Sequence, residues 1–150
     1  MRWTRYPRCD LDESMLRGMM KFMRGLLRMS PWVKAWLGLL MLFNAFVPMF
    51  FLPLIEATIV LATFVASALL MGAITAATGF TRLLGLGHVL WLGLLPYLWG
   101  RLAAFDAGSP EGIWLRGLIA LNLMSLALDV VDVARYARGE RTEIVSGLDT

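Results

Sequence analysis

Residues 44–63 read NAFVPMFFLPLIEATIVLAT, and this stretch decides the fold. Two prolines, Pro48 and Pro53, interrupt a long apolar run, which resumes after Glu56. Proline lacks a backbone N–H and disrupts a helix interior, so the pair predicts a turn between two apolar helices. Glu56 is the only charged residue within residues 35–81. A turn inside such a long uncharged region is typical of a hairpin in a membrane.

The composition supports the same class of protein. Of the 150 residues, 59% are hydrophobic and 17% are charged, with a mean hydropathy of +0.68. A soluble domain carries about 25% charged residues. Because about 20 apolar residues span a hydrocarbon core about 30 Å thick, the chain has room for four crossings and short tails. It has no room for a second folded domain.

We therefore predict an all-α fold, a polytopic integral membrane protein with four transmembrane helices. Interfacial aromatic residues, including Trp32 and Trp99, mark ends of crossings. Pro48 and Pro96 are expected to kink or end the first crossing and to kink the third. The predicted transmembrane domain covers residues 32–135, with crossings at about 32–52, 54–78, 83–99 and 113–134.

A basic segment, residues 1–31, precedes the first crossing and contains a predicted amphipathic helix at about 11–29. Four basic residues at spacings of four, three and four fall on one narrow face, and apolar residues cover the rest. This pattern favours a helix in the interface of an anionic leaflet, with the lipid bilayer as its partner. Alternatively, the helix packs on a partner or on the protein's own bundle. The candidate membrane-surface residues are Arg17, Lys21, Arg24 and Arg28.

The distribution of Lys and Arg predicts the orientation. Four crossings put both termini on one side, which then carries twelve of these residues: eight before the first apolar run, Arg82, and three after Asp132. The other side carries two, Arg101 and Arg116. The positive-inside rule therefore predicts cytoplasmic termini, including a polar tail at 136–150, in a bacterial-type inner (plasma) membrane.

The fourth crossing carries a polar stripe on an otherwise apolar helix, and both aspartates of the stripe lie in its second half. Its members recur at spacings of three and four residues, so they share one face. A carboxylate inside a membrane is costly unless it is paired or hydrated, and such residues are functional hypotheses by default. As candidates for an ion pathway the stripe supplies Asn122, Ser125, Asp129 and Asp132.

His88 is the single histidine and a further pathway candidate. It lies six residues after Arg82, and Asp129 lies six residues before Arg135. At about 1.5 Å per residue, both lie about 9 Å from the cytoplasmic edge. Antiparallel neighbouring helices would bring His88 against Asp129, with Asp132 near Arg82 or Arg135. The pair fits either a proton or ion site or a structural tie.

The second crossing supplies three more pathway candidates on one face, Glu56, Thr63 and Ser67. Glu56 falls in the first turn, where the helix N-terminus stabilises a carboxylate, so one interpretation is a capping acid at the outer interface. The alternative is an oligomer in which one Glu56 per subunit forms a cation-attracting ring, with Thr63 and Ser67 lining the path inward. Hydroxyls in membrane helices also often bond only their own i−4 carbonyl.

Motifs for enzymes and cofactors are absent. The sequence has neither a GxSxG elbow nor an HExxH motif. One histidine and one distant cysteine make no zinc site, and haem bound by paired histidines would require two chains to share His88. The basic residues flank an apolar segment and do not form a nucleic-acid patch. We therefore expect no catalytic residues, no cofactor and no nucleic-acid partner, and the sequence leaves metal binding undefined.

These features favour an oligomeric channel or small transporter for a cation or proton. The second crossing also places Ala68, Gly72 and Ala76 four residues apart, a pattern that lets helices approach closely. A homo-oligomer or an association with other membrane subunits is therefore expected. The alternative function is a non-catalytic accessory, assembly or scaffolding subunit of a larger membrane complex, which the lack of any specific motif favours.

Overall fold

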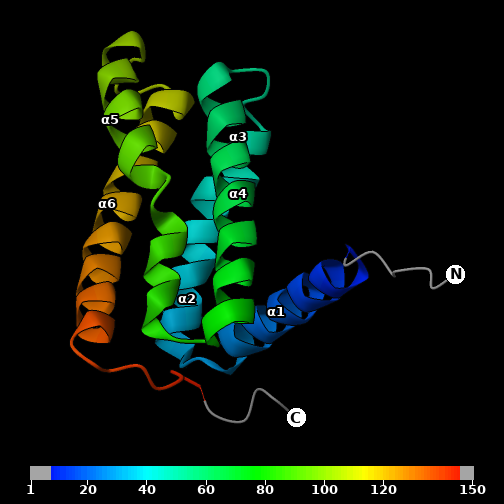
Figure 1. Ribbon diagram of the computed structural model, residues 1–150. Coiled ribbons are helices and arrows are strands. Elements are labelled where there is room, and N and C mark those ends of the chain that lie inside the picture. The colour runs from blue at the N-terminus through cyan, green and yellow to red at the C-terminus, as the bar shows by residue number, and fades with distance from the viewer. Residues whose placement is uncertain (1–7, 146–150) are drawn as a thin grey trace, which may run out of the picture.

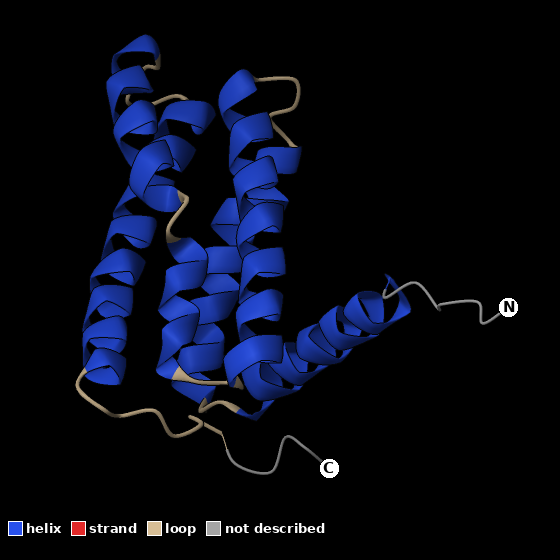
Figure 2. Ribbon diagram, in the orientation of Figure 1, coloured by secondary structure: helices blue, strands red, loops and turns tan. Residues whose placement is uncertain are grey.

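The computed structural model describes residues 8–145, and within them it contains helices and no β-strand (Figure 2). The all-α prediction is confirmed. Residues 1–7 of the predicted basic segment and residues 146–150 of the predicted polar tail lie outside the described residues. The elements are α1 (Arg8–Arg28), α2 (Pro31–Met41), η1 (Leu42–Phe46), α3 (Val47–Met49), α4 (Ile55–Thr78), η2 (Arg82–His88), α5 (Trp91–Arg101), η3 (Leu102–Ala104) and α6 (Pro110–Ala137).

The elements α2, η1 and α3 form the first candidate membrane span, Pro31–Met49. Pro31 lies in the first turn of α2, where its missing N–H leaves no helical bond unmade. In a regular α-helix the ring of Pro48 would clash with the carbonyl of Asn44, four residues earlier. The chain widens here into the π-helical turn η1, which contains Asn44. Where the sequence predicted a kink at Pro48, the structure thus has a π-helical turn just before the proline.

α4 (Ile55–Thr78) has a higher mean hydropathy than the spans Pro31–Met49 and Pro110–Ala137, and it covers nearly the residues expected for the second crossing. Its first turn holds Glu56. It ends at Gly79, whose φ of +77° belongs to a conformation that favours glycine. The Gly79 N–H bonds back to the carbonyl of Thr75 at 2.9 Å, which closes the last turn.

The third span is broken, which the sequence did not predict. The 3₁₀-helix η2 and the helix α5 are bent by 42° relative to each other, at the short break between His88 and Trp91. Pro96, expected to kink this crossing, lies inside α5 beyond the bend. Glycine allows η2 to lie close to its neighbours, since a Cβ on Gly87 would overlap the side chain of Met71 in α4. The break therefore lies beside the close contact between Gly87 and Met71, and not at Pro96.

α6 begins at Pro110, before the start expected at residue 113. The hydroxyl of Ser109 accepts a hydrogen bond from the N–H of Gly112 at 3.0 Å, and Pro110 occupies the first helical position. A serine cap followed by proline is a strong helix start. The boundary was missed because these residues were assigned to the polar loop before the helix.

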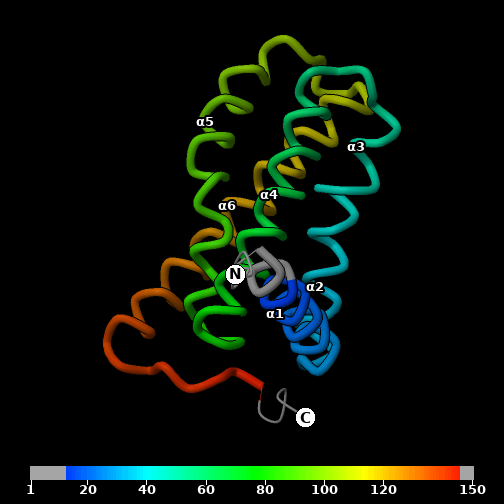
Figure 3. Tube along the Cα trace, turned by 45° about the vertical axis from the view of Figure 1, so that its right-hand side comes forward, coloured from blue at the N-terminus to red at the C-terminus, as the bar shows by residue number. Residues whose placement is uncertain are grey.

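Among residues 8–145, three helices are long and apolar enough to cross a membrane, and the bent pair of η2 and α5 makes a fourth candidate span. The spans run side by side as a bundle (Figures 1 and 3). The base of α2 and the end of α6 lie at one end of the bundle, which we call the terminal end. The opposite end, with the α3–α4 and α5–α6 connections, is called the hairpin end. This arrangement agrees with the predicted fold class.

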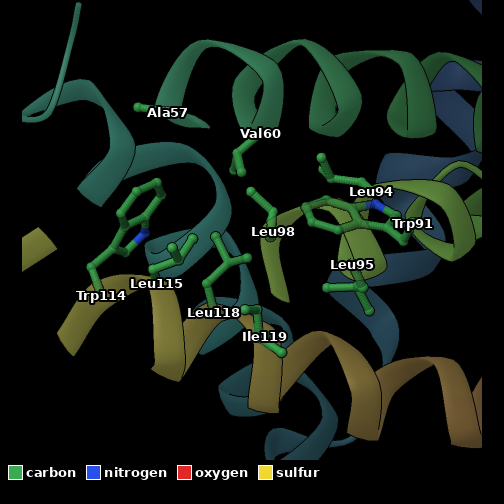
Figure 4. Packing of buried hydrophobic residues seen from close by; sticks show 10 residues of the cluster. All are labelled: Ala57, Val60, Trp91, Leu94, Leu95, Leu98, Trp114, Leu115, Leu118 and Ile119. Carbon is green, nitrogen blue, oxygen red and sulfur yellow. The ribbon is translucent and has the colours of Figure 1, made fainter. Parts of the chain in front are cut away.

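The main core fills the hairpin-end half, where α4, α5 and α6 meet (Figure 4). Leu98, Leu115 and Leu118 are fully buried. Side chains from α5 and α6 point toward one another beneath α4. Close packing of apolar side chains therefore stabilises this half of the bundle. The buried cluster contains Ala57, Val60, Trp91, Leu94, Leu95, Leu98, Trp114, Leu115, Leu118 and Ile119.

α1 packs against the last turns of α4 at the terminal end. A Cβ on Gly18 would lie 2.5 Å from Ala76 Cβ and 2.6 Å from the carbonyl oxygen of Gly72. One on Gly25 would lie 2.5 Å from the ring of Phe80. Gly72, which belongs to the small-residue pattern of α4, is therefore buried under the chain's own α1, whereas Ala76 in the same pattern is exposed. The association of this face with another subunit stays a prediction.

Candidate functional site

His88 and Asp129 form the predicted pair. His88 Nδ1 lies 2.8 Å from Asp129 Oδ2, and the two side chains are 25% and 20% exposed. Gly85 permits this approach, because a Cβ there would lie 3.0 Å from the carbonyl oxygen of Asp129. A neutral imidazole donates to the carboxylate, and a protonated one forms an ion pair with it. The pair can therefore bind a proton at a defined position.

This pair lies at the break of the third span, since His88 is the last residue of η2. Stretches of 3₁₀-helix inside longer helices often mark hinges or strained segments. Broken helices within a membrane are tolerated only where the backbone is covered by protein or lines a hydrated cavity. The terminal half of the bundle thus combines a titratable pair with irregular backbone.

A row of ion pairs continues from His88–Asp129 to the terminal end. Asp132 bonds Arg82, one of the two partners predicted for it. Arg82 also contacts Glu140 at 3.4 Å, and Arg135 donates to the same carboxylate at 3.0 Å. The hydrogen bond from Arg135 lowers the pKa of Glu140 below its ordinary value. These side chains join the ends of η2 and α6 to the segment that follows.

Glu143 ties three parts of the chain together. It accepts from Lys21 Nζ of α1 at 2.7 Å and from the backbone N–H of Phe80 at 3.2 Å. The N–H of Ile144 donates to the carbonyl of Phe80 at 2.9 Å. The segment after α6 therefore crosses the terminal end as a strap. Sequence reasoning treated it as a polar tail, because short-range charge patterns give no sign of partners far away in the chain.

Asn44 and Asn122 form a buried amide pair between η1 and α6. Asn122 Nδ2 donates to Asn44 Oδ1 at 2.8 Å. Each amide also donates to its own i−4 carbonyl, Asn44 to Leu40 at 2.7 Å and Asn122 to Leu118 at 2.8 Å. Ser125, the next member of the α6 stripe, is also buried. The predicted stripe thus faces the protein interior, and its members from Asn122 to Asp132 are turned toward other helices.

Thr63 and Ser67, the residues expected to line a hydrophilic path along α4 in an oligomer, have different surroundings in the single chain. Ser67 is buried and accepts a hydrogen bond from Trp91 Nε1 at 3.1 Å. Thr63 lines an open groove of about 480 Å³ between α4 and α5, together with Ala62, Gly93 and other apolar residues. Glu56, Thr63 and Ser67 therefore have three different surroundings. Their spacing puts them on one side of α4, but α5 meets each of them differently. Trp91 of α5 bonds Ser67, Arg101 of α5 pairs with Glu56, and Thr63 lies at the groove between the two helices.

Glu56 lies at the hairpin end and is paired within the chain. Its side chain is 2% exposed, and Arg101 Nε donates to Glu56 Oε1 at 2.7 Å. Glu56 begins α4 and Arg101 ends α5, so both charges also suit the helix ends that they occupy. In the single chain the Glu56 carboxylate is thus covered by protein and is not exposed as a cation-attracting group would be. The sequence offered one hint of this pair, because Arg101 is one of only two basic residues predicted on that side of the membrane.

The four basic candidates of α1 lie along one side of the helix. The Arg17 side chain is 72% exposed and contacts Glu13 at 3.3 Å, whereas that of Lys21 is 19% exposed and bonds Glu143. Arg24 and Arg28 are exposed and also have partners in the structure. The row is therefore exposed at three of its four positions, and Lys21 joins it to the strap through Glu143.

Among the described residues, no group of three or more His, Cys, Asp or Glu side chains is placed to hold a metal ion. Comparison with protein-family models, with curated proteins and with solved structures finds no match to this chain.

Proposed function

We propose that this chain is a non-catalytic structural subunit, of the accessory, assembly or scaffolding kind, in a larger membrane complex. We place it in a bacterial-type plasma membrane with both termini in the cytoplasm. One observation carries the proposal: polar side chains at successive depths of the bundle bond to one another inside a single chain. They are Glu56 with Arg101, Asn44 with Asn122, Ser67 with Trp91, and His88 with Asp129.

A conducting path needs polar groups that can exchange their partners for water or an ion. Here the hairpin-end half of the interior is filled by leucine and tryptophan, and Leu98, Leu115 and Leu118 are fully buried there. Satisfied polar groups inside a bundle rigidify it and specify one arrangement of helices. Such an interior supports a scaffold better than it supports a pore.

The perimeter of the bundle supports an association with other helices. The groove between α4 and α5 is lined by small residues, including Ala62, Ala66 and Gly93. A Cβ on Gly93 would meet no atom within 4 Å, so contacts inside this chain do not require a glycine there. Small residues on the surface of a membrane helix let a second helix approach closely.

Extraction from the native membrane in a mild detergent, followed by measurement of mass and subunit composition, tests this proposal. We expect a stoichiometric complex with at least one different chain, and loss of that chain in Gly93→Leu. The matched control is Gly100→Leu, where a Cβ also meets no atom within 4 Å but which does not line the groove. A homo-oligomer that conducts ions would overturn the proposal.

A second candidate function, proton or cation transport, is favoured by the His88–Asp129 pair at the break of the third span. Proteoliposomes containing an internal pH dye measure it directly. Transport through this pair predicts proton flux in the wild type that falls at least about tenfold in Asp129→Asn and in His88→Gln, since each removes the titrating partner. Absence of flux in the wild type, or normal flux in Asp129→Asn and Glu56→Gln, would exclude this candidate.

A further inference from the structure

One face of α1 is held on α4. Gly18, Phe22 and Gly25 are buried, and the close backbone approach at Gly18 fixes the distance between the two helices. Phe22 packs against Phe80, with ring centroids 6.2 Å apart. α1 therefore has a fixed rotation about its own axis, and its other faces point in defined directions.

The face opposite this contact is apolar and exposed. Leu16 is 65% exposed, Met20 55%, Met23 49% and Leu27 70%. These residues recur at spacings of four, three and four, so they form one continuous row along the helix. We call it the apolar row. Apolar surface of this kind on an element with a fixed orientation marks an interaction site.

The basic residues Arg17, Lys21, Arg24 and Arg28 follow the same spacing and lie beside the apolar row, one position further along the helix at each step. Their charge complements an anionic partner. Glu13 and Glu143 contact Arg17 and Lys21, but the Arg17 side chain keeps 72% of its surface exposed. A surface that is apolar along one strip and basic along the next fits the headgroup layer of an anionic leaflet.

The position of α1 agrees with this partner. α1 ends at Arg28, close to Pro31, where the first candidate span begins. It does not continue the line of α2 but runs obliquely away from the terminal end of the bundle (Figures 1 and 3). The helix is thus held at the level at which the apolar spans start, which is where a bilayer would end.

We propose that α1 binds the anionic leaflet at the terminal end, with the apolar row inserted among the lipids and the basic row on their phosphates. The face built around Gly18 and Gly25 keeps the helix on α4 at the same time. This binding goes beyond the proposed function, since it holds for a structural subunit and for a transporter alike.

Site-specific fluorescence in vesicles tests the proposal on the full chain. After Cys9→Ser, a single cysteine is introduced by Met20→Cys or Leu27→Cys and labelled with an environment-sensitive dye. The matched control is Thr142→Cys, an exposed position in the strap. Vesicles contain either phosphatidylcholine alone or phosphatidylcholine mixed with phosphatidylglycerol. An aqueous quencher and a lipid-borne quencher are then compared at each position.

We expect dyes at positions 20 and 27 to be shielded from the aqueous quencher and reached by the lipid-borne one, with the reverse at position 142. Shielding should be several-fold stronger with phosphatidylglycerol, and Arg17→Gln with Arg24→Gln should remove this difference. Equal aqueous quenching at positions 27 and 142 would overturn the proposal. Equal shielding in both lipids would overturn the anionic partner, and shielding lost on dilution of the protein would assign the row to a second copy.

Discussion

The two halves of the bundle are stabilised in different ways. The hairpin-end half has a core of leucine and tryptophan and one ion pair, Glu56–Arg101, whose carboxylate is almost fully covered. The described part of the terminal half has few fully buried apolar residues, and it depends on ion pairs, such as Arg82–Asp132, and on glycines at helix contacts. The stability of the hairpin-end half therefore depends mainly on side-chain volume. The stability of the terminal half depends mainly on charge and on the absence of a Cβ at the helix contacts.

Removal of the cation at the hairpin end is expected to have the largest effect. Arg101→Ala takes away the hydrogen-bonding partner of Glu56 and leaves its carboxylate covered. A covered carboxylate left without its partner is strongly destabilising, so we expect the largest loss in free energy of unfolding of the variants considered. Chemical unfolding in detergent micelles, followed by circular dichroism, measures the loss.

The partner substitution tests the reason for this effect. Glu56→Gln leaves the guanidinium of Arg101, whose side chain is 46% exposed, able to turn to solvent. We expect a smaller loss than in Arg101→Ala, and the double variant should recover part of the stability. Equal losses in the two single variants would contradict the view that the covered carboxylate dominates.

A cavity in the main core should have the next largest effect. Leu118 is fully buried between helices, so Leu118→Ala removes packed volume and is expected to lower the free energy of unfolding by about 3 kcal/mol. Leu128, on the same helix, is 55% exposed, and Leu128→Ala serves as the matched control. The same unfolding titration checks both. A similar loss at the two positions would remove the distinction between core and perimeter.

Much of the fold followed from local patterns in the sequence. Apolar length and charge placement predicted the all-α bundle with its preceding amphipathic helix. Counting residues from Arg82 and Arg135 placed His88 and Asp129 at one depth, and their contact is confirmed. This worked because antiparallel helices of known rise convert a position in the sequence into a depth in the bundle.

Contacts that depend on which helices are neighbours were not predictable in the same way. The break after His88 accompanies a close approach at Gly87 to Met71, and no local pattern identifies that neighbour. The Glu143 strap likewise joins groups more than sixty residues apart. Glu56 lies in the first turn of α4, as the sequence predicted, but its pairing with Arg101 was not predicted, although Arg101 is one of only two basic residues expected at that end.

A Cβ at the α1–α4 contact should affect the terminal half alone. Gly18→Ala places a methyl group against Ala76 and the backbone of Gly72, neither of which can move away easily. We expect a loss of about 2 kcal/mol, mostly as undocking of α1, since overpacking acts on the local contact. Hydrogen exchange of α1 amides measures it. Gly38→Ala, where the added Cβ meets no atom within 4 Å, should leave that exchange unchanged.

The smallest expected effect concerns the ion pairs of the strap. The hydrogen bond from Arg135 lowers the pKa of Glu140 in the folded chain, so its contribution to stability is present above the unfolded pKa. It is lost as the pH falls through the lower, folded value. The difference in unfolding midpoint between wild type and Glu140→Gln should therefore be seen at neutral pH and should shrink as the pH falls below the ordinary glutamate pKa and through the lower, folded one.

Salt distinguishes this contribution from packing. Glu140 and Arg135 are exposed, so added salt should shrink the same difference at neutral pH, because exposed charges are screened. The losses in Leu118→Ala and Gly18→Ala arise from volume and should be insensitive to salt. A salt-resistant effect of Glu140→Gln would contradict an electrostatic contribution of this residue, and the role of charge in the terminal half would then rest on the other ion pairs, such as Arg82–Asp132.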